Sequence, residues 1–140
     1  MISIRPAVES DIKALCLLDV IARVENERRE LIRRVVMSKE CFVAVADEKI
    51  IGYGVLNYTF FYNGCIEMIY IHSDYRRNGV GAVLVQYLES ICQTPKLFTS
   101  TNLSNLQMQS LLAKLDYILS GLIHNLDEGD PELVYFKRLR

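Results

Sequence analysis

The spacing of apolar and polar residues changes along the chain, and each change of period marks an expected element. Ser3 to Pro6 is expected to be a short extended segment. A first helix is expected after Ser10, a residue type that caps helices. Its apolar face comprises Ile12, Leu15, Cys16 and Ala22. From Arg28 to Met37 apolar residues again recur at helical spacing, so one strand followed by two helices is expected in this part of the chain.

β-branched and aromatic residues concentrate in the middle of the chain, which is typical of strands. Cys41 to Ala46 and Ile50 to Phe61 flank the polar stretch Asp47-Glu48-Lys49, which predicts a hairpin. Asn63-Gly64 predicts a second tight turn, leading into a third strand from Cys65 to His72. The middle of the chain is therefore expected to be an antiparallel meander.

Helical spacing returns after His72 and is followed by another strand. The apolar face of this third helix comprises Val80, Leu84, Tyr87, Leu88 and Ile91. Pro95 ends the helix, and Leu97 to Ser100 is expected to run parallel to the strand before the helix. Such crossovers are right-handed in nearly all proteins, which places the N-terminus of the helix at the carboxyl edge of the sheet, where ligands bind.

The last part of the chain is expected to contain a fourth helix and a closing hairpin. Ser104 and Gln107 match a capping box that opens a helix ending near Leu115. Tyr117 to Leu126 and Leu133 to Leu139 then form two strands that are separated by an acidic turn. No linker, repeat or low-complexity segment interrupts the pattern, so a single domain over residues 1–140 is expected.

Composition and charge narrow the classes of function. With 140 residues and a formal net charge of -1, the chain is long enough to bury a core and carries no excess of positive charge for a polyanionic partner. The arginines of the second helix are interleaved with glutamates, which favours a solvated helix face over a nucleic-acid surface. Because no apolar run reaches the length of a membrane helix and no signal segment opens the chain, a cytoplasmic protein without a membrane partner is expected.

The four cysteines do not have the spacing of metal ligands or disulfide partners. They are Cys16, Cys41, Cys65 and Cys92, and they are widely scattered. We expect them to be reduced residues of the core, and we expect no metal site.

The segment from Arg76 to Ala82 joins the third strand of the meander to a helix and carries the most specific chemistry. Gly79 and Gly81 remove side chains where a ligand approaches the backbone, and successive N–H groups at a helix N-terminus attract phosphate oxygens. The segment matches neither of two nucleotide-binding motifs. Leu84 stands where the dinucleotide-binding motif G-x-G-x-x-G needs its third glycine, and the Gly-Lys-Ser/Thr of a P-loop is absent. A pyrophosphate-binding turn is the leading interpretation, and glycines that merely allow tight packing are the alternative.

The run Arg76-x-x-Gly79-x-Gly81, after a strand and opening a helix, resembles motif A of the GNAT superfamily of N-acetyltransferases. The expected element order, β-α-α-β-β-β-α-β-α-β-β, is similar to that of the family over residues 1–140, as is the opening Ile4-Arg5-Pro6-Ala7 with Asp11. The resemblance implies an α+β fold with a mixed sheet in one acetyltransferase domain. It also implies acetyl-coenzyme A as the cosubstrate.

By the same resemblance, backbone groups hold most of the cofactor. Arg76 opens the binding run, and the amides that hold the pyrophosphate are those of Arg77, Asn78, Gly79, Val80, Gly81 and Ala82. The preceding strand faces the pantetheine arm through Ile69, Tyr70 and Ile71. Asn105 matches the asparagine that the family places early in the next helix, near the pantetheine.

Glu67 is the candidate catalytic base. The stretch from Ile66 to Ile71 is similar to the strand in which polyamine acetyltransferases place a glutamate facing the acceptor amine. The alternative interpretation is a surface carboxylate on the outer face of the strand. One departure concerns the acid, because Leu112 occupies the position where the family often has a tyrosine that protonates the departing thiolate. Tyr117 is expected to be a packing residue.

The sequence thus favours an acetyl-coenzyme A-dependent N-acetyltransferase acting by direct attack of a small or peptidyl primary amine. A homodimer is compatible with the sequence. A non-catalytic acyl-coenzyme A-binding module is the alternative, motivated by Leu112. A nucleic-acid binder using the arginine-rich helix is the weakest candidate. His72 is expected to be structural, whereas His124 and the acidic turn from Asp127 to Glu132 are open to a role in acceptor binding.

Overall fold

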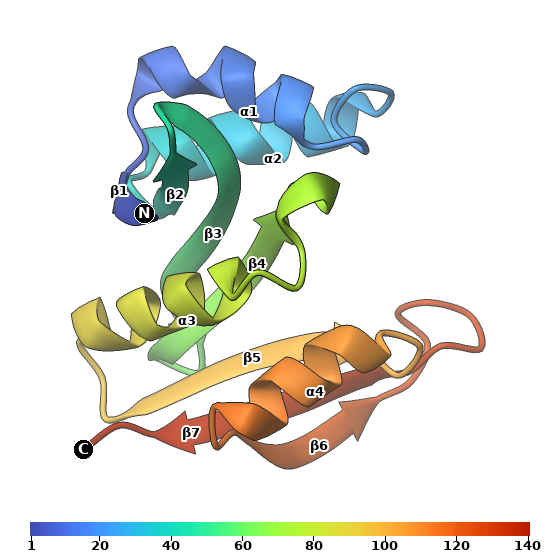
Figure 1. Ribbon diagram of the computed structural model, residues 1–140. Helices are drawn as coiled ribbons and strands as arrows, with labels where there is room; N and C mark the ends of the chain where they lie inside the picture. Colours follow the sequence, from blue (N-terminus) through green and yellow to red (C-terminus); the bar gives the residue numbers. More distant parts are fainter. The chain divides into compact units, whose positions relative to one another are not determined.

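The computed structural model describes residues 1–140 (Figure 1). The chain divides into two compact units. Unit 1 comprises Met1–Leu56 and Met68–Leu88, and unit 2 comprises Asn57–Glu67 and Glu89–Arg140. None of the helices combines the length and the apolar character that crossing a membrane requires.

Unit 1 packs two helices against the first strands of the chain. It holds β1 (Ser3–Pro6), the 3-10 turn η1 (Glu9–Asp11), α1 (Ile12–Leu18), α2 (Asn26–Met37), β2 (Cys41–Ala46), most of β3 (Lys49–Phe60), the second part of β4 (Asn63–Ile71), the 3-10 turn η2 (Ser73–Tyr75) and most of α3 (Val80–Ile91). β2 pairs antiparallel with both β1 and β3. Its core includes five side chains that are at most 1% exposed: Leu15, Ile32, Val35, Val43 and Tyr53.

Unit 2 is built around a parallel strand pair. It holds the end of β3, the start of β4, the end of α3, β5 (Lys96–Asn102), α4 (Leu106–Lys114), β6 (Ile118–Ile123) and β7 (Glu132–Arg138). β4 pairs in parallel with β5 from Gly64↔Leu97 to Ile66↔Thr99, whereas β7 pairs antiparallel with both β5 and β6. With the hydrogen-bonded order β1-β2-β3-β4-β5-β7-β6, the seven strands form a mixed, mostly antiparallel sheet, which confirms the expected fold class and element order.

Two local predictions in the first half of the chain are wrong. The first helix was expected to include Ala22, but α1 ends at Leu18. The Asp19 carboxylate accepts hydrogen bonds from the N–H groups of Ile21 (2.9 Å) and Ala22 (3.3 Å) and holds these residues in a turn. The second tight turn is formed by Phe61 and Tyr62, which have φ of 53° and 65°, and not by Asn63-Gly64.

The residues expected to form that turn have other roles. The Asn63 side-chain amide donates to the Phe61 carbonyl oxygen (3.1 Å) and supports the turn from its end. Gly64 lies inside β4, where a Cβ would collide with the side chains of Cys92 and Thr94. Glycine is therefore required at position 64 by close packing and not by turn geometry.

The predicted cap of the fourth helix is also wrong. α4 begins at Leu106 and its N-cap is Asn105, whose Oδ1 accepts a hydrogen bond from the Met108 N–H (3.1 Å). The Ser104 hydroxyl instead donates to the Asp130 carboxylate (2.6 Å). Sequence spacing does not distinguish these two neighbouring polar residues, because both residue types accept hydrogen bonds at helix N-termini.

Candidate functional site

The loop between β4 and α3 presents a row of backbone N–H groups without protein partners. Val83 is the first residue of this region whose N–H is bonded along the helix, to the Gly79 carbonyl oxygen (3.1 Å). The six preceding N–H groups, from Arg77 to Ala82, donate no hydrogen bond of good geometry to the protein, although residues 76–79 form a turn. Unpaired N–H groups in the first turn of a helix attract anions, because the helix dipole adds to their partial charges.

Two residues of this loop lie in the left-handed region of backbone conformation. Arg77 has φ of 68° and Gly79 has φ of 79°. A Cβ placed on Gly79 would meet no atom within 4 Å, so glycine is favoured there by its conformation and not by packing. The loop therefore combines open space with a glycine-dependent backbone, as an anion-binding turn requires.

The Arg76 side chain connects the start of the loop to β4. Its Nε donates to the Ile71 carbonyl oxygen (2.9 Å), and its guanidinium lies 5.8 Å from the centroid of the Tyr70 ring. The side chain thus ties the start of the loop back to the end of β4.

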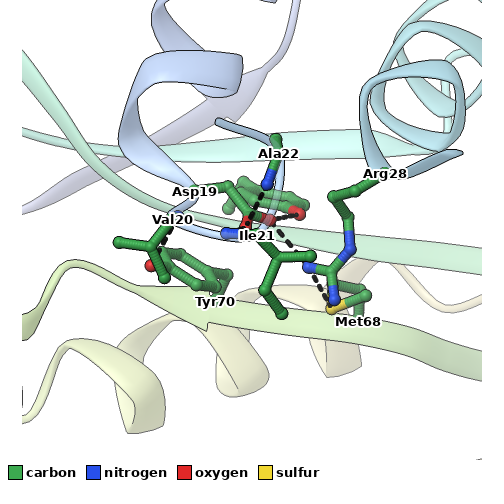
Figure 2. A network of polar contacts seen from close by, with 8 residues as sticks. Asp19, Val20, Ile21, Ala22, Arg28, Met68 and Tyr70 are labelled. Atoms are coloured by element: carbon green, nitrogen blue, oxygen red, sulfur yellow. Dashed lines mark hydrogen bonds and ion pairs between the residues drawn. The ribbon is translucent and has the colours of Figure 1, made fainter. Parts of the chain in front are cut away.

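Tyr70 points into the interior of unit 1. Its hydroxyl accepts a hydrogen bond from the Val20 N–H (3.2 Å), and its ring stacks on Tyr53 with 5.9 Å between centroids. Figure 2 shows Tyr70 beneath the turn that follows α1. The Tyr70 side chain is therefore a packing element, which leaves its backbone as the part suited to face a ligand.

A buried carboxylate holds that turn and was missed by sequence reasoning. Asp19 is fully buried and accepts hydrogen bonds from the Tyr53 hydroxyl (2.6 Å) and the Arg28 guanidinium (2.7 Å) in addition to the two turn amides (Figure 2). Burial and the bond to Asp19 raise the pKa of Tyr53, so the phenol stays protonated.

The expectation that the second helix turns all its arginines to solvent is wrong for Arg28, whose side chain is only 18% exposed. Its pairing with Asp19 explains this burial, because a buried charge is stable only when paired. The signal in the sequence was the aspartate inside the apolar run Leu17-Leu18-Asp19-Val20-Ile21.

Glu67 lies in unit 2 on β4 and is exposed. Its Oε2 accepts a hydrogen bond from the side-chain amide of Asn57, which is only 5% exposed. The orientation of that amide is set by Thr59, whose N–H (3.3 Å) and hydroxyl (2.9 Å) both donate to the Asn57 Oδ1. A buried, oriented amide therefore holds the candidate base, and sequence reasoning did not identify Asn57.

The other residues considered for the reaction have structural roles in unit 2. Leu112 is fully buried. The hydroxyl of the buried Tyr117 donates to Glu89 (2.9 Å), which also accepts from Lys137 (3.1 Å), in agreement with the expected packing role. Burial and the Glu89 charge raise the pKa of Tyr117.

The two histidines differ in their surroundings. In unit 1, the His72 Nδ1 accepts a hydrogen bond from the Asp74 N–H (3.0 Å) and caps η2, as a structural residue would. In unit 2, His124 is exposed. The structure contains no group of three or more His, Cys, Asp or Glu side chains placed to hold a metal ion.

The cysteines are all free thiols. Burial raises the pKa of Cys41 to about 12, and burial followed by the charge of Glu67 raises the pKa of Cys65 to about 11. Neither thiol is an activated nucleophile at neutral pH, because only the thiolate reacts.

Comparison with known proteins identifies the class to which this fold and loop belong. The family model described as "Acetyltransferase (GNAT) family" matches residues 17–117. The chain belongs to the GNAT family of acetyltransferases, whose acetyl donor is acetyl-coenzyme A.

Three solved structures illustrate the similarity. A GNAT-family acetyltransferase from Bacillus cereus is 30% identical, with 99% of this chain and 97% of that chain covered and a TM-score of 0.92. The ribosomal-protein-S18-alanine N-acetyltransferase from Escherichia coli shares the fold at 14% identity, with 99% and 94% covered and a TM-score of 0.80. A Bacillus anthracis protein in complex with acetyl coenzyme A shares it at 20% identity, with 70% and 61% covered and a TM-score of 0.65. No curated protein sequence matches the chain.

Proposed function

We propose that this protein is an N-acetyltransferase that moves the acetyl group of acetyl-coenzyme A to a primary amine by direct attack. The observation that carries the proposal is the row of six unpaired N–H groups from Arg77 to Ala82. The row fits a pyrophosphate, because it offers several donors to closely spaced phosphate oxygens without requiring a positively charged protein. A cytoplasmic location and a homodimer stay predictions.

The rest of the cofactor is assigned by family resemblance. The backbone of Ile69, Tyr70 and Ile71 would face the pantetheine, and the inward packing of Tyr70 is compatible with that role. Asn105 would face the same arm. Its Oδ1 is used by the helix cap, so its side-chain NH2 is the group left for the cosubstrate.

Glu67 would receive the ammonium of the acceptor and pass one proton to water. An ordinary amine with a pKa of ~10.4 is neutral in about one molecule in 2,500 at pH 7, which corresponds to ~4.6 kcal/mol. A carboxylate with a pKa of ~4.3 does not remove that whole cost, so its main contribution is to bind and orient the amine. The Asn57 amide supports this role by holding one carboxylate oxygen.

The neutral amine nitrogen then forms a bond to the thioester carbonyl carbon, and the carbon–sulfur bond breaks with its electron pair on sulfur. The nitrogen loses its second proton to water or Glu67. Because Leu112 has no hydroxyl and is fully buried, the thiolate leaves without a dedicated acid at that position. A thiol with a pKa of ~8.5 makes this departure only modestly unfavourable.

The buried Leu112 is also what favours the alternative, a non-catalytic acyl-coenzyme A-binding module. Thiol release from acetyl-coenzyme A across a panel of amines separates the two functions, with product mass confirming acetylation at nitrogen. Turnover with at least one amine is the expected result. Tight binding of acetyl-coenzyme A without release for any amine would support the binding module, and failure to bind it would reject both.

A further inference from the structure

Unit 2 contains a pocket of about 340 Å³ that none of the assigned cofactor residues lines. Its walls come from β3 to β7 and the loop after β6, and they consist of Phe60, Cys65, Phe98, Thr99, Ser100, Ile123, Leu126, Asp127, Glu132 and Val134. We call it the Phe98 pocket. Six of these residues are apolar, two are carboxylates and none is basic. The volume suits a small organic ligand.

The apolar part of the Phe98 pocket combines half-buried aromatic rings with exposed aliphatic side chains. The rings of Phe60 and Phe98 lie 5.0 Å apart at 45°, and Phe98 stacks on Phe136 at 5.6 Å. Ile123 is 41% exposed and Leu126 is 64% exposed. A ligand with an apolar body would remove this surface from water, which is the main favourable term in such binding.

The two carboxylates are held in place by hydrogen bonds from β5. The Asn102 amide donates to the Asp127 Oδ2 (2.9 Å), and the Ser100 hydroxyl donates to the Glu132 Oε2 (2.6 Å). Each carboxylate is bound through one oxygen by a neutral donor, so its negative charge is not cancelled. The Phe98 pocket therefore combines two carboxylates in fixed orientations with apolar walls.

The candidate base belongs to the same part of unit 2. Cys65 lines the pocket and Glu67 follows two residues later on β4. Side chains two residues apart on a strand project from the same face, so the Glu67 carboxylate lies on the same face of β4 as the Cys65 side chain that lines the pocket. Together with Asp127 and Glu132, it gives this region three carboxylates.

We propose that the Phe98 pocket selects the acceptor as a primary amine with an aromatic or similarly apolar body and no carboxylate beside the amine. This inference rests on the proposed function. Asp127 and Glu132 attract the ammonium and repel an amino acid's carboxylate. The apolar walls favour a ring over the hydroxyls of an aminoglycoside, because most of those hydroxyls would be desolvated without partners.

The test compares two amines that differ in one group. Phenethylamine and phenylalanine share the ring and the amine, and only phenylalanine carries a carboxylate. We expect kcat/KM for phenethylamine to exceed that for phenylalanine by at least about tenfold, and that for ethylamine by at least about tenfold because the ring is buried. Equal or reversed preference would overturn the inference.

Two matched variants test whether the preference comes from this pocket. Ile123→Lys adds a positive charge to the pocket wall, whereas Ile118→Lys makes the same change on the same strand at a residue that does not line it. We expect the first to raise KM for phenethylamine about two- to fivefold and the second to leave it within about twofold. Equal effects of the two variants would overturn the inference.

A binding measurement separates failure of this inference from failure of the proposed function. Methyl signals of Ile123 and Leu126 are followed by NMR during titration of phenethylamine in the presence of coenzyme A. Signal shifts without acetylation of any amine would reject the proposed function, but they would still show that the pocket binds an aromatic amine. Acetylation of amino acids or aminoglycosides in preference to phenethylamine, without such shifts, would reject the pocket inference alone.

Discussion

Two candidate parts of the site use different chemical groups. The loop from Arg77 to Ala82 in unit 1 uses the backbone, and the Glu67–Asn57 pair in unit 2 uses side chains. The loop offers only backbone N–H groups, placed by a glycine at φ of 79° and by the start of α3. The pair depends on two side chains, a carboxylate and the buried amide that holds it. The loop is suited to a charged group that is the same in every reaction, whereas the pair is suited to a particular amine.

This difference predicts unequal tolerance to substitution. The loop should accept side-chain changes that keep its backbone conformation, because its N–H groups are present in every residue except proline. At Glu67 the side chain itself is the functional group, so a change that preserves shape and removes charge should be decisive. The following substitutions test this contrast.

The largest effect is expected for Glu67→Gln. Glutamine can still accept the Asn57 hydrogen bond and lacks the negative charge, so kcat/KM with a cationic amine should fall by roughly 100- to 10,000-fold. Affinity for acetyl-coenzyme A should stay near that of the wild type. Glu48→Gln, in the exposed turn between β2 and β3, is the control and should retain activity. Wild-type turnover by Glu67→Gln would return Glu67 to the role of a surface carboxylate.

An intermediate effect is expected when the backbone of the loop is disturbed. Valine is strained at positive φ, so Gly79→Val and Gly129→Val, at φ of 79° and 74° with open space around both, should each lose about 1–2 kcal/mol. Acetyl-coenzyme A at 100 times its dissociation constant should stabilise the wild type by about 2.7 kcal/mol.

The two glycine variants should differ only in their response to ligand. Thermal unfolding with and without acetyl-coenzyme A should show the stabilisation intact in Gly129→Val and largely lost in Gly79→Val. If a folded Gly79→Val protein were stabilised as much as Gly129→Val, the loop would not be the cofactor site.

The smallest effect on activity is expected for Leu112→Tyr, which introduces the tyrosine that the family resemblance implies at this position. Because Leu112 is fully buried, the larger side chain should cost ~1–3 kcal/mol of stability by overpacking. Turnover per folded molecule should not increase, since the hydroxyl would be enclosed by the core. A large increase in turnover without loss of stability would show that position 112 reaches the thiolate.

The contrast between loop and pair also explains what the sequence reveals. Gly79 and Gly81 after a strand are a local pattern, so the loop and the element order could be predicted. Asn57 and Glu67 are ten residues apart and meet only because β3 and β4 form a hairpin, so their hydrogen bond has no local signal. The same holds for Asp19 with Tyr53, which are 34 residues apart.

Local signals also failed where several residues have equivalent chemistry. Ser104 and Asn105 both suit a helix cap, and only the bond from Ser104 to Asp130 in a later loop decides between them. Asn63-Gly64 suits a turn by composition, but packing against Cys92 and Thr94 assigns Gly64 to a strand. Tertiary contacts outweigh these propensities because each propensity typically contributes only about 1 kcal/mol.

We propose that the unpaired N–H groups of Arg77 to Ala82 hold the pyrophosphate of acetyl-coenzyme A. ¹H–¹⁵N NMR detects this binding at the amides themselves, during titration with acetyl-coenzyme A and, separately, with S-acetylpantetheine, which lacks the pyrophosphate. We expect acetyl-coenzyme A to shift these six signals strongly, S-acetylpantetheine to leave them in place, and Val83, already bonded to Gly79, to respond least. Saturable binding of acetyl-coenzyme A with these six signals unmoved would show that the pyrophosphate binds elsewhere.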